Sequence, residues 1–272
     1  MTGRIYPVFR SLFFALLFSG LCSPAESKSN PDIVHFKKGE EIHAKDDKAY
    51  ALMRYESNTK SPSIMLLRIP STEEMTGYEA AKQAAYQAAG NKAGPYDSFL
   101  FKYQAVTNFY EIKPNRAIQK EGKSTTVVVE LPTGNYVIYG TGWHGSLYQC
   151  FCFGTVGFQL KKGEITDIGK ILVAKAWKPS KFPELAGEDD LGTTAFLTLA
   201  LYAVGLKPTN SDDIPAVLAD KKVVAASLFA VGPYLETNTA LMNRMAPIPG
   251  VLAYDSGKVI DVSSGLEAVP NF

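Results

Sequence analysis

The sequence predicts a mainly β fold: an antiparallel β-sandwich with one packed helix and a C-terminal α/β extension. Short apolar or alternating segments recur from Lys48 onward, and Gly- and Pro-containing turns separate them. One stretch, residues 70–90, has instead the 3.6-residue spacing of a helix. Several strands at short spacing favour an antiparallel sandwich over a parallel sheet, whose strands would alternate with helices.

Four regions are expected along the chain. Residues 1–25 form an export signal, and residues 26–45 a polar leader arm. Residues 46–176 form the β-sandwich domain. Residues 177–272 form a helical extension that ends in a β-hairpin.

The signal is expected to be cleaved after Ala25, because a basic segment precedes the apolar run 11–21 and small residues follow it. The run is shorter than the roughly 20 residues that a membrane-spanning helix needs, so no transmembrane span is expected after signal removal. Cys22 raises the alternative of a lipid anchor. That alternative is less favoured, because Leu21 stands where a lipidation signal generally has a small residue.

The composition excludes several classes of function. The chain has 272 residues, of which 28 are basic and 27 acidic. Removal of the signal takes away two arginines, which leaves 26 basic and 27 acidic residues and no positive surplus for a nucleic acid. With 46% hydrophobic residues the chain can bury a core, which excludes disorder. The two cysteines beyond the signal are too few for a disulfide scaffold.

The helix begins with a capping box, in which Ser71 is the N-cap and Glu74 its reciprocal partner. Gly90 supplies the stop. Alanines recur on one face, which predicts that the helix approaches a sheet closely.

Strands are expected at 48–55, 63–69 and 98–106. Two hairpins are expected as well, with 125–131 paired to 135–140 and 150–160 paired to 165–174. The apolar run 193–204 predicts a buried helix, and another short helix is expected from Ser211. A last hairpin joins 250–254 to 258–262.

Three segments carry a resemblance: Leu131-Pro132-Thr133-Gly134-Asn135-Tyr136, the stretch Lys162 to Gly169, and Pro247 to Tyr254. In these the chain resembles an uncharacterised group of exported proteins from Gram-negative bacteria with a transthyretin-like or immunoglobulin-like β-domain. The resemblance implies a sandwich fold and a location in the cell envelope. It brings no activity, and it brings no catalytic residues.

Motifs for catalysis are absent from the sequence. No Gly-x-Ser-x-Gly elbow, His-Glu-x-x-His segment, phosphate loop or dinucleotide fingerprint occurs. Two of the three histidines, His35 and His43, fall in the leader arm, and His144 is the third. No catalytic residue and no cofactor are therefore assigned. A pair of carboxylates stays open as a hydrolytic site, because any two acids can meet in space.

Cys150-Phe151-Cys152 has three interpretations. On one continuous strand both thiols would point to the same side as Val156, Phe158 and Leu160, so the favoured interpretation is a pair of buried structural thiols. A disulfide between them would close a very small and reducible ring. Two thiolates with His144 would instead suit copper(I) or zinc.

The glycine-rich loop 140–148 is the candidate binding site, because recognition loops lie at the ends of sandwiches. Its Trp143, His144 and Tyr148 are suited to stacking on a sugar or a peptide. The alternative is that Trp143 caps the edge of the core.

These observations favour a non-catalytic binding or structural protein of the cell envelope, periplasmic or exposed at the surface. Its ligand or partner protein is not indicated by the sequence. The alternative is a hydrolase that acts on envelope polymers through a carboxylate pair.

Overall fold

The structure, a computed structural model, describes ten segments of the chain: residues 33–57, 61–101, 108–143, 147–176, 178–185, 202–208, 214–232, 241–246, 252–255 and 258–261. The backbone alone is described for residues 143, 147–148, 241–242, 252–255 and 258–261. The expected signal, residues 1–25, and Cys22 lie outside the described residues.

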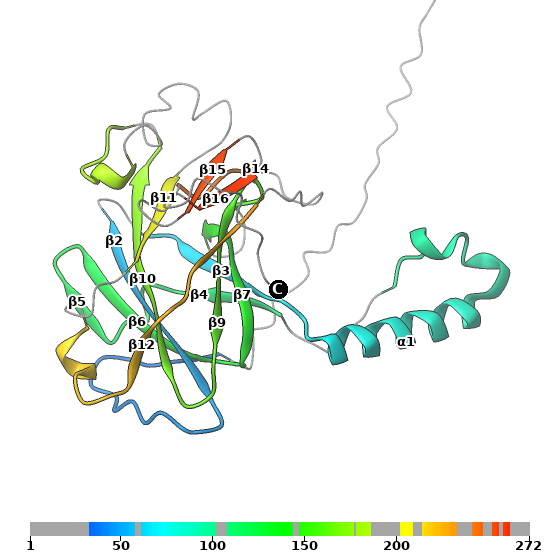
Figure 1. Cartoon of the computed structure of the whole chain (residues 1–272), viewed down its shortest axis with the longest axis horizontal. Helices are drawn as coiled ribbons and strands as arrows, with labels where there is room; N and C mark the ends of the chain where they lie inside the picture. The colour runs from blue at the N-terminus through cyan, green and yellow to red at the C-terminus, as the bar shows by residue number, and fades with distance from the viewer. Residues whose placement is uncertain are drawn as a thin grey trace, which may run out of the picture.

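Two sheets face each other in the body of the molecule (Figure 1). Sheet A has the strand order β1 (Val34–His35), β6 (Ser124–Leu131), β2 (Ala49–Ser57), β10 (Ile165–Lys175) and β11 (Tyr202–Lys207). Two further strands join it, β5 (Gln119–Glu121) beside β6 and β12 (Val223–Ala225) beside β10.

Sheet B has the strand order β13 (Phe229–Val231), β9 (Thr155–Leu160), β7 (Gly134–Trp143), β3 (Ser63–Arg68) and β4 (Phe109–Ile112). β8 (Leu147–Cys150) pairs with β7, and β14 (Leu241–Met242) pairs with β8. A separate hairpin of β15 (Leu252–Asp255) and β16 (Lys258–Asp261) matches the last hairpin that the sequence predicts.

The main core lies between the inner faces of the two sheets. Sheet A contributes alternate residues of its strands, among them Ala51, Met53 and Tyr55 of β2. Sheet B contributes aromatic rings, and Tyr136 stacks on Phe158 with 5.7 Å between the ring centroids. Full burial of one such side chain stabilises the fold by about 1.5–3 kcal/mol.

The outer face of sheet A is covered as well. Tyr50, Leu52 and Ile165 form a second apolar cluster there, on the side of the sheet opposite the main core. Ile42 and Leu218 cover this cluster from outside the sheet. The central strands β2 and β10 of sheet A are therefore buried on both faces, which accounts for their nearly continuous burial.

The mainly β fold class is confirmed: the described residues form two large sheets, one small two-stranded sheet and one α-helix. The antiparallel order that the sequence predicts has exceptions: β12 runs parallel to β10 in sheet A, and β14 runs parallel to β8 in sheet B. In sheet A β2 and β10 also run parallel, with Tyr50 beside Ile165 and Ser57 beside Val173. A bulge between Asp167 and Gly169 interrupts this pair. Parallel neighbours cannot be joined by a tight turn, so the chain passes through both sheets between β2 and β10.

Both expected internal hairpins are wrong. The turn 132–134 connects β6 of sheet A to β7 of sheet B, and the turn 161–164 connects β9 of sheet B to β10 of sheet A. The first turn is closed by Tyr136, whose hydroxyl donates to Pro132 O at 2.6 Å. The second turn is bonded to β2 of sheet A, where Tyr50 N–H donates to Glu164 O at 3.1 Å. In both places the two consecutive strands therefore belong to different sheets.

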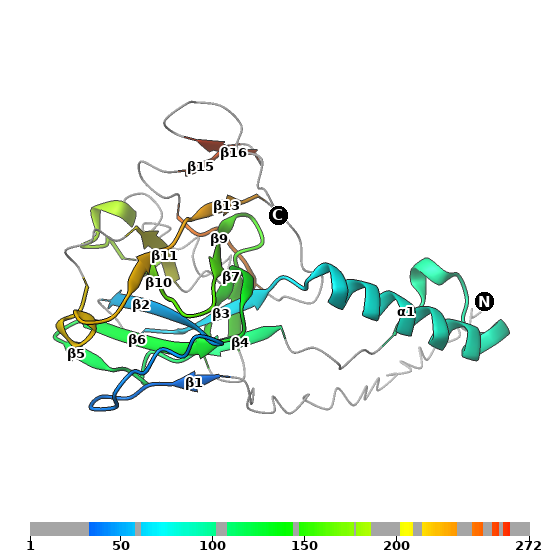
Figure 2. The same cartoon turned by 60° about the horizontal axis from the view of Figure 1, so that its bottom comes forward.

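The helix α1 (Thr72–Ala89) has the predicted ends. Glu74 N–H donates to Ser71 Oγ at 3.2 Å, Ser71 N–H donates to Glu74 Oε2 at 2.7 Å, and Gly90 is the C-cap. Its position differs from the expected close approach to a sheet. None of its residues is buried, and it projects from the sandwich (Figure 2). An ion pair from Arg68 Nη2 to Glu74 Oε1, at 2.5 Å, ties its first turn to β3.

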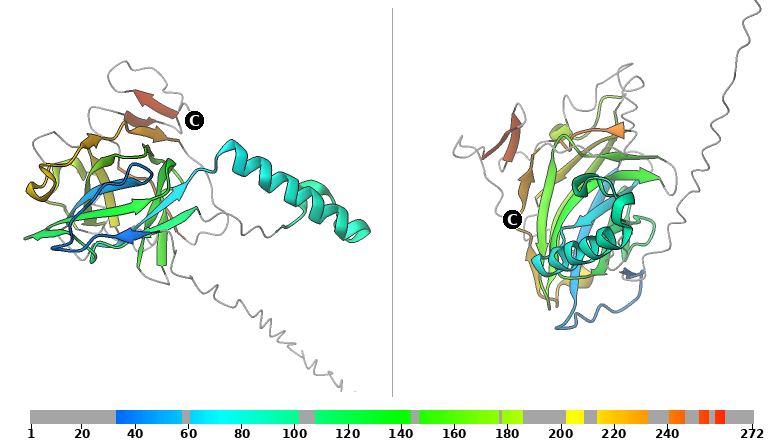
Figure 3. Two further views of the ribbon diagram at one scale, coloured as in Figure 1. Left: turned by 90° about the horizontal axis from the view of Figure 1, so that it is seen from below. Right: turned by 90° about the vertical axis from the view of Figure 1, so that its right-hand side faces the viewer.

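The chain that follows α1 returns along it and covers one of its faces. Tyr86 makes edge-to-face contacts with Tyr96 and Phe99, at 5.0 and 5.4 Å between ring centroids. Tyr96–Ser98 forms a 3-10 turn, so the strand expected at 98–106 is wrong at its start, and residues 102–107 lie outside the described residues. The helix therefore packs Tyr86 against this return, and it projects away from both sheets (Figure 3).

The regions that the sequence divides are joined in the sheets. β1 of the expected leader arm is an edge strand on β6, and β11 to β14 of the expected helical extension belong to sheets A and B. Residues 202–204 of the expected buried helix start the strand β11, and the described part of the next expected helix is a single 3-10 turn, Ala216–Leu218. The rest of 193–204 and residues 211–213 lie outside the described residues.

His35 on β1 gives the fold a pH dependence. Burial, followed by Arg116 and Lys113, lowers its pKa from 6.5 to about 4, while Glu111 acts in the opposite direction. The folded chain favours the neutral ring of His35, so protonation of this ring lowers the free energy of unfolding. The contribution of His35 to stability is complete above pH 6.5 and is lost as the pH falls toward 4. We expect the urea midpoint of the wild type to fall between pH 6.5 and 4.5.

His35→Gln is the control for this expectation, because it keeps a hydrogen-bond acceptor for Lys113 N–H, which lies 3.4 Å from His35 Nε2. The midpoint of this variant should change less over the same pH interval. Equal slopes for the two proteins would show that His35 does not carry the effect.

Candidate functional site

The structure places the expected binding loop in the hairpin of β7 and β8. Gly142 is opposite Tyr148, and Trp143 is opposite Leu147, so the two strands extend further into this segment than the sequence indicates. His144 lies in this loop, outside the described residues, and the side chains of Trp143 and Tyr148 are not described either. Where these three side chains point therefore stays a prediction.

Gly140 is required by the close approach of β8. A Cβ atom at this position would lie 2.2 Å from the backbone oxygen of Gln149. The register of β7 against β3 also shifts here, because Met65 pairs with Gly140 while Leu66 pairs with Ile138. The glycine and the bulge together set which side of sheet B each following residue faces.

Two buried polar residues stand at the base of this hairpin. Thr141 is opposite Gln149, and both share the face of Ile64, a residue of the main core. Thr141 is 1% exposed and Gln149 is 4% exposed. Thr141 Oγ1 and both side-chain amide atoms of Gln149 have no hydrogen-bond partner in the structure. An unsatisfied buried group costs about 1–3 kcal/mol, so such groups require an explanation.

Tyr55 adds a third neutral group from the facing sheet. Its hydroxyl is fully buried and has no hydrogen-bond partner in the structure. Tyr55 lies two residues before the end of β2, and Ile64, the neighbour of Thr141, follows across the short connection 58–62. All three residues therefore lie at the same end of the sandwich, and we call them the buried polar set.

The buried polar set is suited to neutral ligand groups. Burial raises the pKa of Tyr55, so its hydroxyl stays protonated. A hydroxyl and a carboxamide each donate and accept hydrogen bonds, as the hydroxyl or amide group of a ligand, or a water molecule, also does. With no charge in the set, it offers no general base for catalysis.

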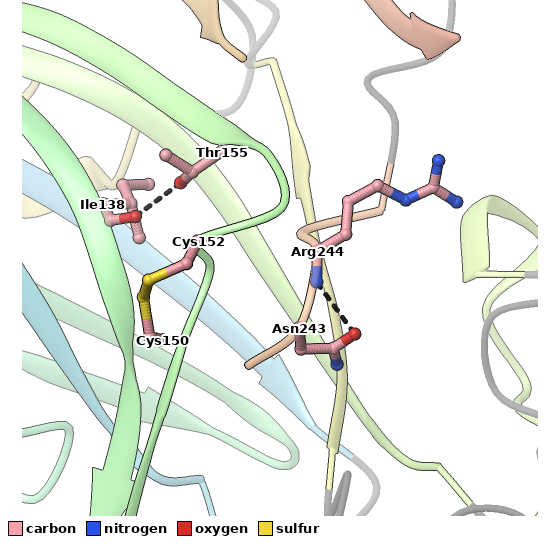
Figure 4. The surroundings of a disulfide bond; sticks show 6 residues. All are labelled: Ile138, Cys150, Cys152, Thr155, Asn243 and Arg244. Carbon is pink, nitrogen blue, oxygen red and sulfur yellow. Dashed lines mark hydrogen bonds between the residues drawn. A yellow bond between two sulfur atoms is a disulfide. The ribbon is translucent and has the colours of Figure 1, made fainter. Parts of the chain in front are cut away.

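The two cysteines form a disulfide on the other side of sheet B (Figure 4). Both are 0% exposed, which confirms the expected burial, but the expected free thiols are wrong. Bonded sulfurs are not thiolate ligands, so the copper or zinc alternative would first require reduction. Among the described residues no three metal-ligating side chains gather at one place.

The expected sharing of one face by the cysteines and by β9 is also wrong. Cys150 and Cys152 pack with Met65 and Tyr139 in a small cluster apart from the main core, which holds Val156, Phe158 and Leu160. The strand is not continuous, because β8 ends at Cys150 and β9 begins at Thr155. The turn between them changes the face.

One buried ion pair lies on sheet A. Arg54 Nη2 contacts both carboxylate oxygens of Asp167, at 2.7 and 2.6 Å, and Gly169 N–H donates to Asp167 Oδ1 at 3.0 Å. Arg54 is 4% exposed and Asp167 is 3% exposed. The charge of Asp167 is thus neutralised within the fold. It lies beside the bulge of β10, where it accepts the hydrogen bond of Gly169 N–H.

Sequence reasoning missed the buried polar set and the ion pair, although weak signals for the ion pair exist. Arg54 interrupts the apolar run of β2, and Asp167 interrupts the apolar run of β10. A charge within a buried strand indicates a buried partner. Gln149 next to Cys150 carried no such signal, because its inward direction depends on the register with β7.

In the part of the chain that the structure describes, no helix is both long enough and apolar enough to cross a membrane. No protein-family model matches the chain, and no curated protein and no solved structure matches it either.

Proposed function

We propose that the protein is an exported, non-catalytic binding protein of the cell envelope, and that its ligand binds at the β7–β8 end of the sandwich. The observation that carries this proposal is the buried polar set, whose hydrogen-bonding groups are unpartnered beneath a hairpin that contains Trp143 and Tyr148. The absence of charge in the set favours a ligand with neutral hydroxyl or amide groups. A saccharide or a peptide of the envelope has such groups.

Two observations support export. The N-terminus has the order of basic, apolar and small residues that directs chains out of the cytoplasm. The disulfide of Cys150 and Cys152 suits an oxidising compartment such as the periplasm, since thiols stay reduced in the cytosol.

The alternative, a hydrolase with a carboxylate pair, gains less support. Among the described residues Asp167 is the one buried acid, and Arg54 neutralises it. A general acid needs instead a carboxyl group whose pKa is raised beside a second carboxylate.

Two substitutions test the binding proposal. Trp143→Ala removes the proposed stacking surface, and Gln149→Met removes an unpartnered amide at similar volume. We expect both variants to lose binding, measured by calorimetry against soluble muropeptides and neutral oligosaccharides of the host envelope. We expect Trp143→Ala to leave the thermal midpoint unchanged. Gln149→Met should leave stability unchanged or raise it by about 1–3 kcal/mol, because it relieves an unsatisfied buried group.

A fluorescence measurement uses the variant Trp177→Phe. The chain has two tryptophans, so in this variant all tryptophan emission comes from Trp143. The emission of Trp143 should shift when a ligand binds. A loss on the order of 3 kcal/mol in Trp143→Ala would identify a core cap instead. Retained binding in both variants would place the ligand elsewhere and contradict the proposal.

A further inference from the structure

A short segment near the C-terminus holds the edge of sheet B. Residues 243–246, called the strap below, run beside the loop 150–154 that contains the disulfide (Figure 4). Three backbone hydrogen bonds join the strap to this loop: Asn243 N–H to Cys150 O at 2.7 Å, Phe153 N–H to Asn243 O at 3.1 Å, and Met245 N–H to Gly154 O at 2.9 Å. The strap thus depends on the shape of the loop.

The strap also reaches sheet A. Ala246 N–H donates to Val204 O of β11 at 2.8 Å, and Ala246 forms a parallel bridge with Gly205. The Met245 side chain is 0% exposed and belongs to the main core. The strap therefore connects the edges of the two sheets and fills part of the space between them.

The disulfide determines the shape of the loop. Its cysteines are two residues apart, so the ring contains one intervening residue, Phe151. Stabilisation through chain entropy grows with the length of the closed loop, so this disulfide contributes little to the fold as a whole. Its effect is local: it fixes the carbonyl of Cys150 and the backbone that leads to Phe153, and both bond to Asn243.

We propose that the disulfide of Cys150 and Cys152 is a reducible latch that holds the strap in place. A very small ring makes a disulfide easier to reduce than a structural one in a long loop. The reductant is a dithiol. One of its thiolates attacks the sulfur of one cysteine and displaces the sulfur of the other cysteine as a thiolate, which takes up a proton. The second thiol of the reductant then attacks the mixed disulfide. The products are two cysteine thiols and an oxidised reductant.

Reduction and release of the strap are coupled in both directions. Two thiol sulfurs need more room than two bonded ones, so reduction spreads the loop and weakens its hydrogen bonds to the strap. Both cysteines are 0% exposed, and the loop that holds them bonds to the strap, so detachment of the strap frees this loop to open toward a reductant. At equilibrium, detachment of the strap favours reduction by the same factor by which reduction favours detachment. This inference does not depend on the proposed ligand.

Hydrogen exchange of the full-length mature protein, with and without dithiothreitol, tests the latch. Free thiols are counted by alkylation in the same samples. We expect reduction to speed exchange of the amides at 243–246 by about tenfold or more, with little change in β2 and β6. The double variant Cys150→Ser, Cys152→Ser should show the fast exchange without reductant and no further change with it.

Three outcomes would overturn the proposal. The first is a disulfide that dithiothreitol leaves intact in the folded protein. The second is full reduction with unchanged exchange in the strap. The third is faster exchange throughout both sheets, which would make the disulfide a general cross-link rather than a local latch.

Discussion

Asp167→Ala is expected to destabilise the protein by about 3–5 kcal/mol, measured by urea unfolding. The change leaves Arg54, which is 4% exposed, as a buried charge without its carboxylate. It also removes the acceptor of Gly169 N–H at the bulge of β10. Because β10 is central in sheet A, between β2 and β11, the loss should appear as unfolding of the whole molecule.

Two controls show whether the loss of stability comes from leaving a buried charge unpaired. Glu164→Ala breaks the ion pair with Lys222, at 2.8 Å, whose lysine is 72% exposed, and should cost less than about 1 kcal/mol. The double variant Arg54→Met, Asp167→Leu removes both charges and should recover most of the stability lost in Asp167→Ala. A similar small loss for Asp167→Ala and Glu164→Ala would mean that water reaches the buried pair.

Local signals in the sequence predicted the helix correctly but not its place. Ser71, Glu74 and Gly90 act on the backbone within a few residues, so the ends of α1 follow from the sequence. The surface that the helix packs against depends on which apolar side chains other parts of the chain place beside it. The aromatic residues of the return segment, such as Tyr96 and Phe99, supply that surface.

Strand partners depend on contacts between distant parts of the chain. The segments 125–131 and 135–140 alternate as a hairpin would, and the turn between them suits a hairpin. An inter-sheet turn has the same local pattern, and what distinguishes it is that Leu131 pairs with Ala49 and Tyr136 with Phe158. The sandwich could therefore be predicted from the sequence, and the order of its strands could not.

The site was only partly predictable for the same reason. The aromatic, glycine-rich character of 140–148 indicated which end of the sandwich to consider. The inward direction of Gln149 follows from its pairing with Thr141, and that of Thr141 from its pairing with Ile64 across a bulge. No periodicity read along a single strand contains this information.

The second prediction with a large expected effect on stability concerns the turn between β8 and β9. The sequence placed the cysteines and Phe158 on one face, whereas the turn 151–154 places them on opposite faces of sheet B. Phe153, in that turn, is 43% exposed, and Phe158 is fully buried. The same substitution at these two phenylalanines therefore compares a site in the turn with a site in the core.

We expect Phe158→Ala to destabilise the protein by about 3–5 kcal/mol, because it leaves a cavity beside Tyr136, whose ring it stacks on at 5.7 Å. Phe153→Ala should cost less than about 1 kcal/mol, because that ring is half exposed in the folded chain. Urea unfolding of both variants beside the wild type measures the difference. Equal losses would contradict the half-exposed position of Phe153 in the turn, and a larger loss for Phe153→Ala would place that ring, rather than Phe158, against the core.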